Sequence, residues 1–166
     1  MQYILMTLMA AGIVAADQFT KYLTVQNIAL GAQEEAINGL FHFTYTKNYG
    51  AAWSSFEGMQ WLFAAIFIIF TAALVWEFWK KSMGFTRFER WCLVAVWAGG
   101  LGNMIDRVRM GYVVDMIRVD FMDFPVFNVA DIFITCGCIL LLAHLVLFHR
   151  EFWKSEKKET GNDPDC

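Results

Sequence analysis

The chain has 166 residues, of which 58% are hydrophobic and 17% aromatic, and its mean hydropathy is +0.43. Because soluble domains are about 45–50% apolar, this composition argues against an ordinary soluble protein. The formal net charge of −3 excludes a large basic surface for nucleic acid. We therefore expect a single membrane domain over residues 1–153, followed by a polar cytoplasmic tail over residues 154–166.

Four segments are long and apolar enough to cross a bilayer, which takes about 20 residues in a helix. The sequence predicts these spans over residues 3–23, 58–76, 91–107 and 129–148. We interpret the first as a retained helix and not as a secretory signal, because no Lys or Arg precedes its apolar run. Gly99, Gly100 and Gly102 in the third span allow a neighbouring backbone to approach closely.

Residues 24–57, between the first two spans, have the pattern of a small β element. The run from Leu40 to Thr46 is rich in strand-forming residues, and Asn38-Gly39 before it is typical of a hairpin turn. An isolated hairpin is barely stable in water, so we expect this element to rest on the bilayer or on the helices. The predicted fold class is all-α integral membrane, with four transmembrane helices and a small extracytoplasmic β element.

The distribution of Lys and Arg predicts the orientation of the spans. Basic residues concentrate in the short link between the second and third spans and in the tail, whereas the opposite side carries fewer, in longer loops. Since cytoplasmic loops carry an excess of Lys and Arg, we expect both termini in the cytoplasm. The residues on this predicted side are Lys80, Lys81, Arg87, Arg90, Arg150, Lys154, Lys157 and Lys158.

Polar motifs interrupt the chain at the predicted outer ends of the spans. The first span ends at Asp17 to Lys21, the third ends at Asn103 to Arg107, and the fourth begins beside Asn128. Asp115 lies in the outer loop between the last two spans, within an apolar run. Ionisable groups at or inside a bilayer are costly, so their default interpretation is a functional site. The sequence predicts a cluster of Asp and Asn residues at the extracytoplasmic surface.

Structural explanations compete with chemistry for several of these residues. Asn128 can cap the fourth helix, and Asp131 in its first turn complements the helix dipole. Asp17 and Lys21 are four residues apart, so a helix-end ion pair accounts for them. Asn103, Asp106 and Arg107 share one helix face, and we interpret Asp106 as structural support.

Asp115 and Asp131 form the more informative pair. Two neighbouring carboxylates cannot easily both ionise, so one pKa rises and the pair holds one proton. Such a dyad can take a proton from water while it protonates the carbonyl that the water attacks, which is aspartic-protease chemistry. Asn103 and Asn128 are placed to orient the carbonyl or the carboxylates.

Other chemistries fit less well. The sequence has no H-E-x-x-H, P-loop or dinucleotide motif, and we expect no metal and no cofactor. The apolar Cys92, Cys136 and Cys138 are predicted to be small buried hydrophobes. A small transporter or proton pathway is the alternative function, although it should carry polar residues through the bilayer midplane. A non-catalytic assembly factor, in which the polar groups only join helices, is a third hypothesis.

Five motifs, in order and at the ends of the spans, resemble those of lipoprotein signal peptidase, also called signal peptidase II. The resemblance covers nearly the whole chain. The motifs are Asp17-Gln18-x-Thr20-Lys21, Asn48-x-Gly50-Ala51-Ala52, Gly99-Gly100-Leu101-Gly102-Asn103-x-x-Asp106-Arg107, Val113-Val114-Asp115 and Phe127-Asn128-x-Ala130-Asp131.

The resemblance implies an aspartic endopeptidase of the bacterial cytoplasmic membrane. It implies cleavage of diacylglyceryl prolipoproteins before the lipidated lipobox cysteine, inhibition by globomycin, and contact with membrane lipids. It makes Asp115 and Asp131 the catalytic pair, with the active site on the extracytoplasmic side. The positions that it implies to be substrate-binding or supporting are Asp17, Lys21, Asn48, Gly50, Asn103, Asp106, Arg107, Asn128 and Ala130. Lys47 departs from an Arg common in the family; a Lys keeps the charge at this position but lacks the bidentate geometry of Arg.

Overall fold

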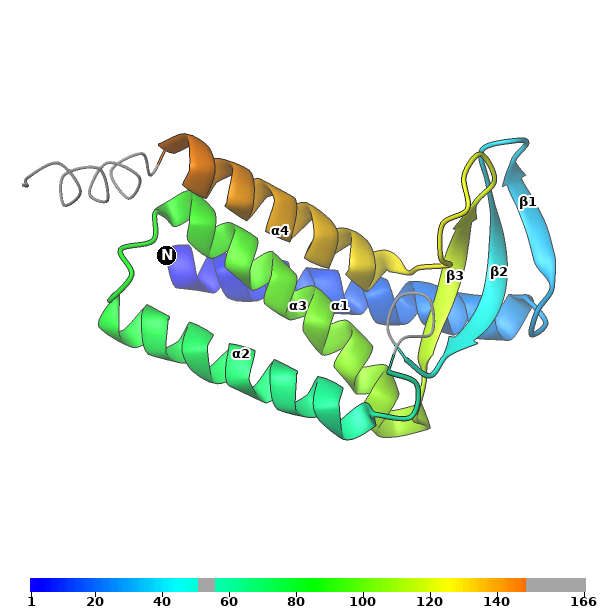
Figure 1. Ribbon diagram of the computed structural model, residues 1–166, viewed down its shortest axis with the longest axis horizontal. Coiled ribbons are helices and arrows are strands. Elements are labelled where there is room, and N and C mark those ends of the chain that lie inside the picture. Colours follow the sequence, from blue (N-terminus) through cyan, green and yellow to red (C-terminus); the bar gives the residue numbers. More distant parts are fainter. Residues whose placement is uncertain (51–55, 149–166) are drawn as a thin grey trace, which may run out of the picture.

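The computed structural model describes residues 1–50 and 56–148. It contains four long helices, α1 (Gln2–Asn27), α2 (Gln60–Lys80), α3 (Arg87–Met110) and α4 (Val129–Phe148). A three-stranded sheet of β1 (Gln33–Ile37), β2 (Phe41–Asn48) and β3 (Val113–Val119) stands at one end of the helices (Figure 1). The predicted tail over residues 154–166, and the end of the predicted domain at residue 153, lie outside the described residues.

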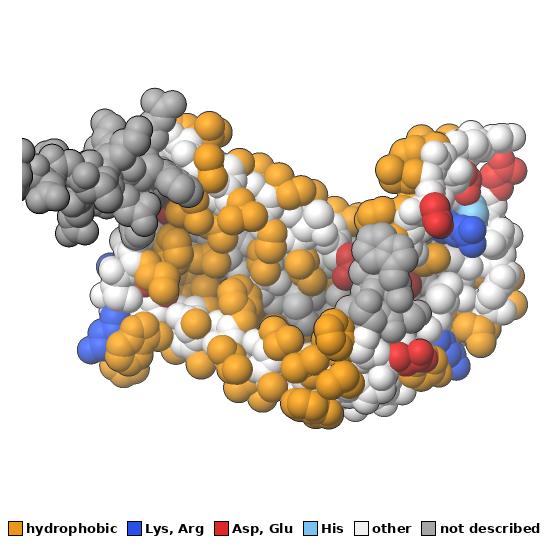
Figure 2. Space-filling model, viewed as in Figure 1, with side chains coloured by type: hydrophobic (Ala, Val, Ile, Leu, Met, Phe, Trp, Pro, Cys, Tyr) orange, Lys and Arg blue, Asp and Glu red, His pale blue; other side chains and the backbone are white. Residues whose placement is uncertain are grey.

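Among the described residues, α1, α2 and α4 are long and apolar enough to cross a membrane. Their outward faces expose large apolar side chains, among them Ile69 of α2 and Leu142 of α4. Figure 2 shows such side chains over the length of the helices, as a surface in contact with lipid requires. The remaining helix, α3, carries Arg87, Glu89 and Arg90 at its start and further charges at its end. These charges lower its mean hydropathy.

The helices pack around α3. Its residues Val94 and Ala98 meet Met6, Ala10 and Ile13 of α1 in a buried apolar cluster. A capping box starts α3: the Glu89 backbone N–H donates to the Thr86 hydroxyl, and the Glu89 carboxylate accepts from the Thr86 N–H. This cap fixes the end of α3 farther from the sheet.

Two glycines of α3 allow the close approach predicted from the sequence. A Cβ on Gly99 would lie 2.5 Å from the Ala130 carbonyl oxygen of α4, and a Cβ on Gly102 would lie 2.5 Å from Asp17 Oδ2 of α1. Only residues without a side chain fit such contacts. The two glycines therefore bring α1 and the start of α4 against the same stretch of α3.

The sheet corrects two predictions from the sequence. Its strand order is β1-β2-β3, and both pairs are antiparallel. The run around Asp115 was predicted to be a loop but forms the strand β3, paired with β2. Residues 24–57 are not all β element, because α1 continues to Asn27. The predicted turn at Asn38-Gly39 does join β1 to β2, with Gly39 at φ 71°.

Candidate active site

The two aspartates of the predicted pair come from different elements that meet where the helices face the sheet. Asp115 is the third residue of β3, and Asp131 lies in the first turn of α4. Asn128, which immediately precedes α4, binds both of them. Its Nδ2 donates to Asp115 Oδ1 at 2.7 Å, and its backbone N–H donates to Asp131 Oδ2 at 3.1 Å. The fold thus places both carboxylates on one fully buried asparagine.

Asn128 and Asp131 also cap α4, as the structural alternative predicted. The Asp131 backbone N–H donates to Asn128 Oδ1 at 3.1 Å, which completes a reciprocal pair of hydrogen bonds. Because a backbone N–H can only donate, this bond fixes which end of the Asn128 amide faces Asp115. Capping therefore orients the side chain instead of excluding it from chemistry.

Asp115 lies almost entirely out of solvent, with 2% of its surface exposed. Besides Asn128, Asn48 of β2 donates to it, from Nδ2 to Oδ2 at 2.9 Å. Burial, followed by the negative charge of Asp131, raises the pKa of Asp115 from an ordinary 3.8 to about 7, against the lowering effect of the two asparagines. Asp115 is therefore suited to exchange a proton near neutral pH.

Asn103 of α3 connects the pair to the interior. Its Nδ2 donates to Asp131 Oδ1 at 2.8 Å, and its Oδ1 accepts from Asn128 Nδ2 and Lys21 Nζ. Each oxygen of Asp115 and Asp131 thus accepts a hydrogen bond from Asn48, Asn103 or Asn128. These donors hold both carboxylates in place before any substrate arrives.

A buried ion cluster around Lys21 contacts Asn103, because Lys21 Nζ donates to Asn103 Oδ1. Lys21 Nζ lies 2.9 Å from Asp17 Oδ2 and 3.0 Å from Asp106 Oδ2. The predicted pair of Asp17 and Lys21 is present, and Asp106 joins it while accepting from the Val114 N–H next to Asp115. Asp106 thereby links Lys21 of α1 to the backbone of β3.

The other predicted residues lie around this centre. Asp17 Oδ1 accepts from the Ala130 backbone N–H at 3.0 Å, which ties α1 to the start of α4. Arg107 donates to the Gly50 carbonyl at 2.8 Å and lies over the Phe63 ring, 4.3 Å from its centroid. Gly50 in turn donates its N–H to Asn48 Oδ1, which fixes the direction of that amide.

A cavity of about 800 Å³ opens beside the pair. Its polar part is lined by Asn48, Asn103, Arg107 and both aspartates. The remainder is mostly apolar and comes from α2, α3 and the segment around α4. Its apolar residues include Phe63, Ile66, Phe67, Phe70, Phe124, Phe127 and Ile132. A mostly apolar cavity with a few convergent polar groups is typical of a substrate site.

Some predictions about individual residues change, and some contributors were missed. Cys92 is buried, but Cys136 is exposed and lines the cavity, so the prediction that it is buried is wrong. Lys47 lies 4.8 Å from the centroid of the Tyr112 ring. Gln18 was quoted only as part of a motif, yet its Nε2 donates to Asp106 Oδ1 and to the Gly102 carbonyl. The one feature of the sequence that indicated a role for Gln18 was its position directly after Asp17.

Comparison with known proteins decides the family. The sequence pattern of the family described as Signal peptidase (SPase) II matches residues 9–147. The chain belongs to the signal peptidase II family. It is 45% identical over 143 residues to a lipoprotein signal peptidase of Enterococcus faecalis, across 84% of this chain and 86% of that protein. It is 37% identical over 165 residues to one of Streptococcus agalactiae, across 98% of this chain and all of that protein.

Solved structures agree with this membership. A bacterial membrane enzyme determined by the in meso method superposes with a TM-score of 0.78 at 32% identity, covering 97% of this chain and 93% of that one. A second such structure superposes with a TM-score of 0.77 at 37% identity, covering 86% of this chain and 93% of that one. The resemblance predicted from the motifs is confirmed: the chain is a bacterial membrane protein and an aspartic endopeptidase of the signal peptidase II family.

Proposed function

We propose that this signal peptidase II removes signal peptides from diacylglyceryl-modified prolipoproteins by cleaving before the lipidated lipobox cysteine. The observation that carries the proposal is the position of Asp115 and Asp131 at the polar end of a mostly apolar cavity. Such a cavity suits a lipid-modified segment, and the two carboxylates supply the hydrolytic groups. The comparisons offer no support for a transporter or proton pathway.

In the proposed mechanism Asp115 carries the shared proton, in agreement with its pKa of about 7. Asp131 takes a proton from a water molecule as the water oxygen bonds to the scissile carbonyl carbon, and Asp115 gives its proton to the carbonyl oxygen. The tetrahedral intermediate then collapses. Asp131 gives its proton to the leaving nitrogen, the C–N bond breaks, and one hydroxyl proton returns to Asp115. The products are a carboxylic acid on the signal peptide and a free amine on the lipidated cysteine.

The surrounding residues have supporting roles in this proposal. Asn48, Asn103 and Asn128 hold the carboxylates through their amide N–H groups, while the cluster of Asp17, Lys21 and Asp106 holds Asn103 and β3 in position. Two further hydrogen bonds join the elements that carry these groups. One runs from Arg107 of α3 to the Gly50 carbonyl, and the other runs from the Ala130 N–H of α4 to Asp17 of α1.

In the proposed topology all four helices cross the membrane, α3 included. Both termini lie in the cytoplasm, and the sheet lies outside. The N-terminus, the end of α2, the start of α3 and the end of α4 gather at the end of the bundle opposite the sheet (Figure 1). Lys80, Lys81, Arg87 and Arg90 belong to that end. This concentration of basic residues supports a cytoplasmic position for it.

Purified protein should cleave a diacylglyceryl prolipoprotein in detergent, whereas the same precursor without the lipid should be a far poorer substrate. Globomycin-type inhibitors should compete with the lipidated substrate by occupying the cavity. The proposal fails if the protein processes both precursors equally well, or if it processes neither.

A further inference from the structure

Gly100 is the glycine of α3 that the packing of α1 and α4 does not explain. A Cβ on Gly99 or Gly102 would collide with α4 or α1, whereas a Cβ on Gly100 would meet the Phe67 ring of α2, with two ring carbons at 3.2 and 3.3 Å. Both Gly100 and Phe67 line the catalytic cavity. The missing side chain at Gly100 therefore allows the Phe67 ring to lie back against α3.

Contacts between α2 and α3 hold the Phe67 ring in this position. The ring stacks on Trp97, one turn before Gly100, with centroids 6.2 Å apart and an interplanar angle of 22°. Trp97 is itself fixed, because its Nε1–H donates to Thr71 Oγ1 of α2 at 3.0 Å. Thr71 donates in turn to the Phe67 carbonyl at 2.7 Å. Since α3 lies behind the ring, a displaced Phe67 would move toward the open side, which is the cavity.

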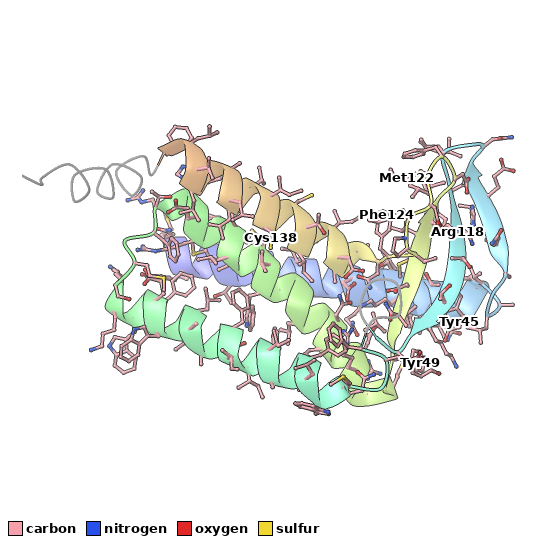
Figure 3. The ribbon with its side chains drawn as sticks, in the orientation of Figure 1. Tyr45, Tyr49, Arg118, Met122, Phe124 and Cys138 are labelled. Carbon is pink, nitrogen blue, oxygen red and sulfur yellow. The ribbon has the colours of Figure 1, made fainter. Side chains whose placement is uncertain are left out.

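Phe67 forms part of a cavity wall close to the two aspartates. Gly100 precedes Asn103, which binds one of the aspartates, by three residues, a distance of about 4.5 Å along α3. The opposite wall includes Ile132 of α4, and α2 and α4 lie on either side of α3 (Figure 1). At its outer end the cavity is lined by Phe124, which Figure 3 shows between the start of α4 and β3. The position of the Phe67 ring thus sets the width of the cavity just inside the catalytic pair.

We propose that Phe67 is a specificity-determining residue, positioned by Gly100, that selects narrow apolar groups of the substrate near the scissile bond. The inference rests on the proposed function, since it concerns the substrate of that reaction. A wall that is held from behind discriminates by size, because extra carbon atoms force strained contacts. The group that passes Phe67 belongs to an acyl chain or to the signal peptide, and both present the same hydrocarbon chemistry.

Two pairs of synthetic diacylglyceryl substrates test this size limit. In one pair the peptide is constant, and the acyl chains are straight palmitoyl or methyl-branched phytanoyl. In the other pair the chains are palmitoyl, and the third residue before the cysteine is Leu or Trp. For the wild-type protein, the bulky member of at least one pair should have a KM higher by roughly tenfold, as expected for a few extra carbon atoms in an apolar pocket. The pair that responds identifies whether lipid or peptide passes Phe67.

Two variants should shift this KM ratio in opposite directions. Phe67→Leu removes part of the ring and widens the cavity, so it should lower the ratio to about threefold or less. Gly100→Ala pushes the ring inward, so it should raise the ratio. Gly12→Ala is the matched control, because it makes the same substitution in a helix where a Cβ has nothing within 4 Å. It should leave the ratio at the wild-type value.

Thermal unfolding verifies that each variant is folded, and Gly100→Ala carries the test by itself if Phe67→Leu does not fold. Equal KM values within both pairs for the wild type would overturn the role of Phe67 while leaving the proposed function intact. A folded variant that fails to shift the ratio in the stated direction would do the same. If the wild type cleaves no lipidated substrate, the proposed function falls and this inference falls with it.

Discussion

Replacing Lys21 by Met should be among the most destabilising single changes in this protein. Lys21 is 3% exposed, and its ammonium lies within 3.0 Å of Asp17 and Asp106 while also donating to Asn103. Methionine fills similar volume but supplies neither the charge nor the donors. The substitution leaves two buried carboxylates facing each other without a cation.

The magnitude follows from burial. Removing one partner of a buried ion pair costs about 3–5 kcal/mol, because the remaining charge stays desolvated. Since the marginal stability of a domain is about 5–15 kcal/mol, a loss of this size should lower the midpoint of thermal unfolding markedly. Adding Asp17→Asn to the Lys21→Met protein restores the net charge of the cluster and should recover part of the loss.

Thermal unfolding in one detergent, followed by circular dichroism, measures these effects on the two variants. Lys80→Met is the control, because Lys80 is an exposed lysine at the end of α2 and should cost less than about 1 kcal/mol. The reasoning is refuted if Lys21→Met unfolds with the control, or if Asp17→Asn worsens the double variant.

Three further predictions concern the site and the packing around it. The rate of cleavage should fall as pH rises through about 7, because Asp115 then loses the shared proton. The free energy of unfolding should also decline between about pH 4 and 7, since the folded chain still binds a proton there that the unfolded chain has released. Asp115→Asn should abolish this decline. Gly102→Ala should cost about 1–3 kcal/mol in thermal unfolding, because its Cβ would overlap Asp17, whereas Gly12→Ala, with open space around it, should not destabilise. Thr86→Ala should cost about 1 kcal/mol through loss of the α3 cap without changing KM.

The sequence predicted the helices well because their signal is local. Long apolar segments and their polar ends are visible along the chain, and the observed helices overlap all four predicted spans. Charges at both ends of α3 made its membrane-spanning character the weakest of the four. The glycine pattern also predicted close packing, because a missing side chain is a local property with a spatial consequence.

The strand β3 was missed for the opposite reason. Val113–Val119 has strand-forming residues, but a strand is stabilised by its partner, and β2 lies far away in sequence. The directions of the asparagine amides were equally hidden. They depend on donors from other elements, such as Lys21 for Asn103 and the Gly50 N–H for Asn48. The polar motifs at the ends of the spans indicated a polar cluster, but only the fold shows which oxygen faces which donor.

The central claim is that Asp115 and Asp131 together cleave the substrate. The most direct measurement is the rate at which purified Asp115→Asn and Asp131→Asn proteins cleave a diacylglyceryl prolipoprotein, with folding verified by thermal unfolding. Each variant should lose activity by at least about a hundredfold, as expected when a general acid or base is removed. A folded variant of either kind that cleaves at the wild-type rate would contradict the account.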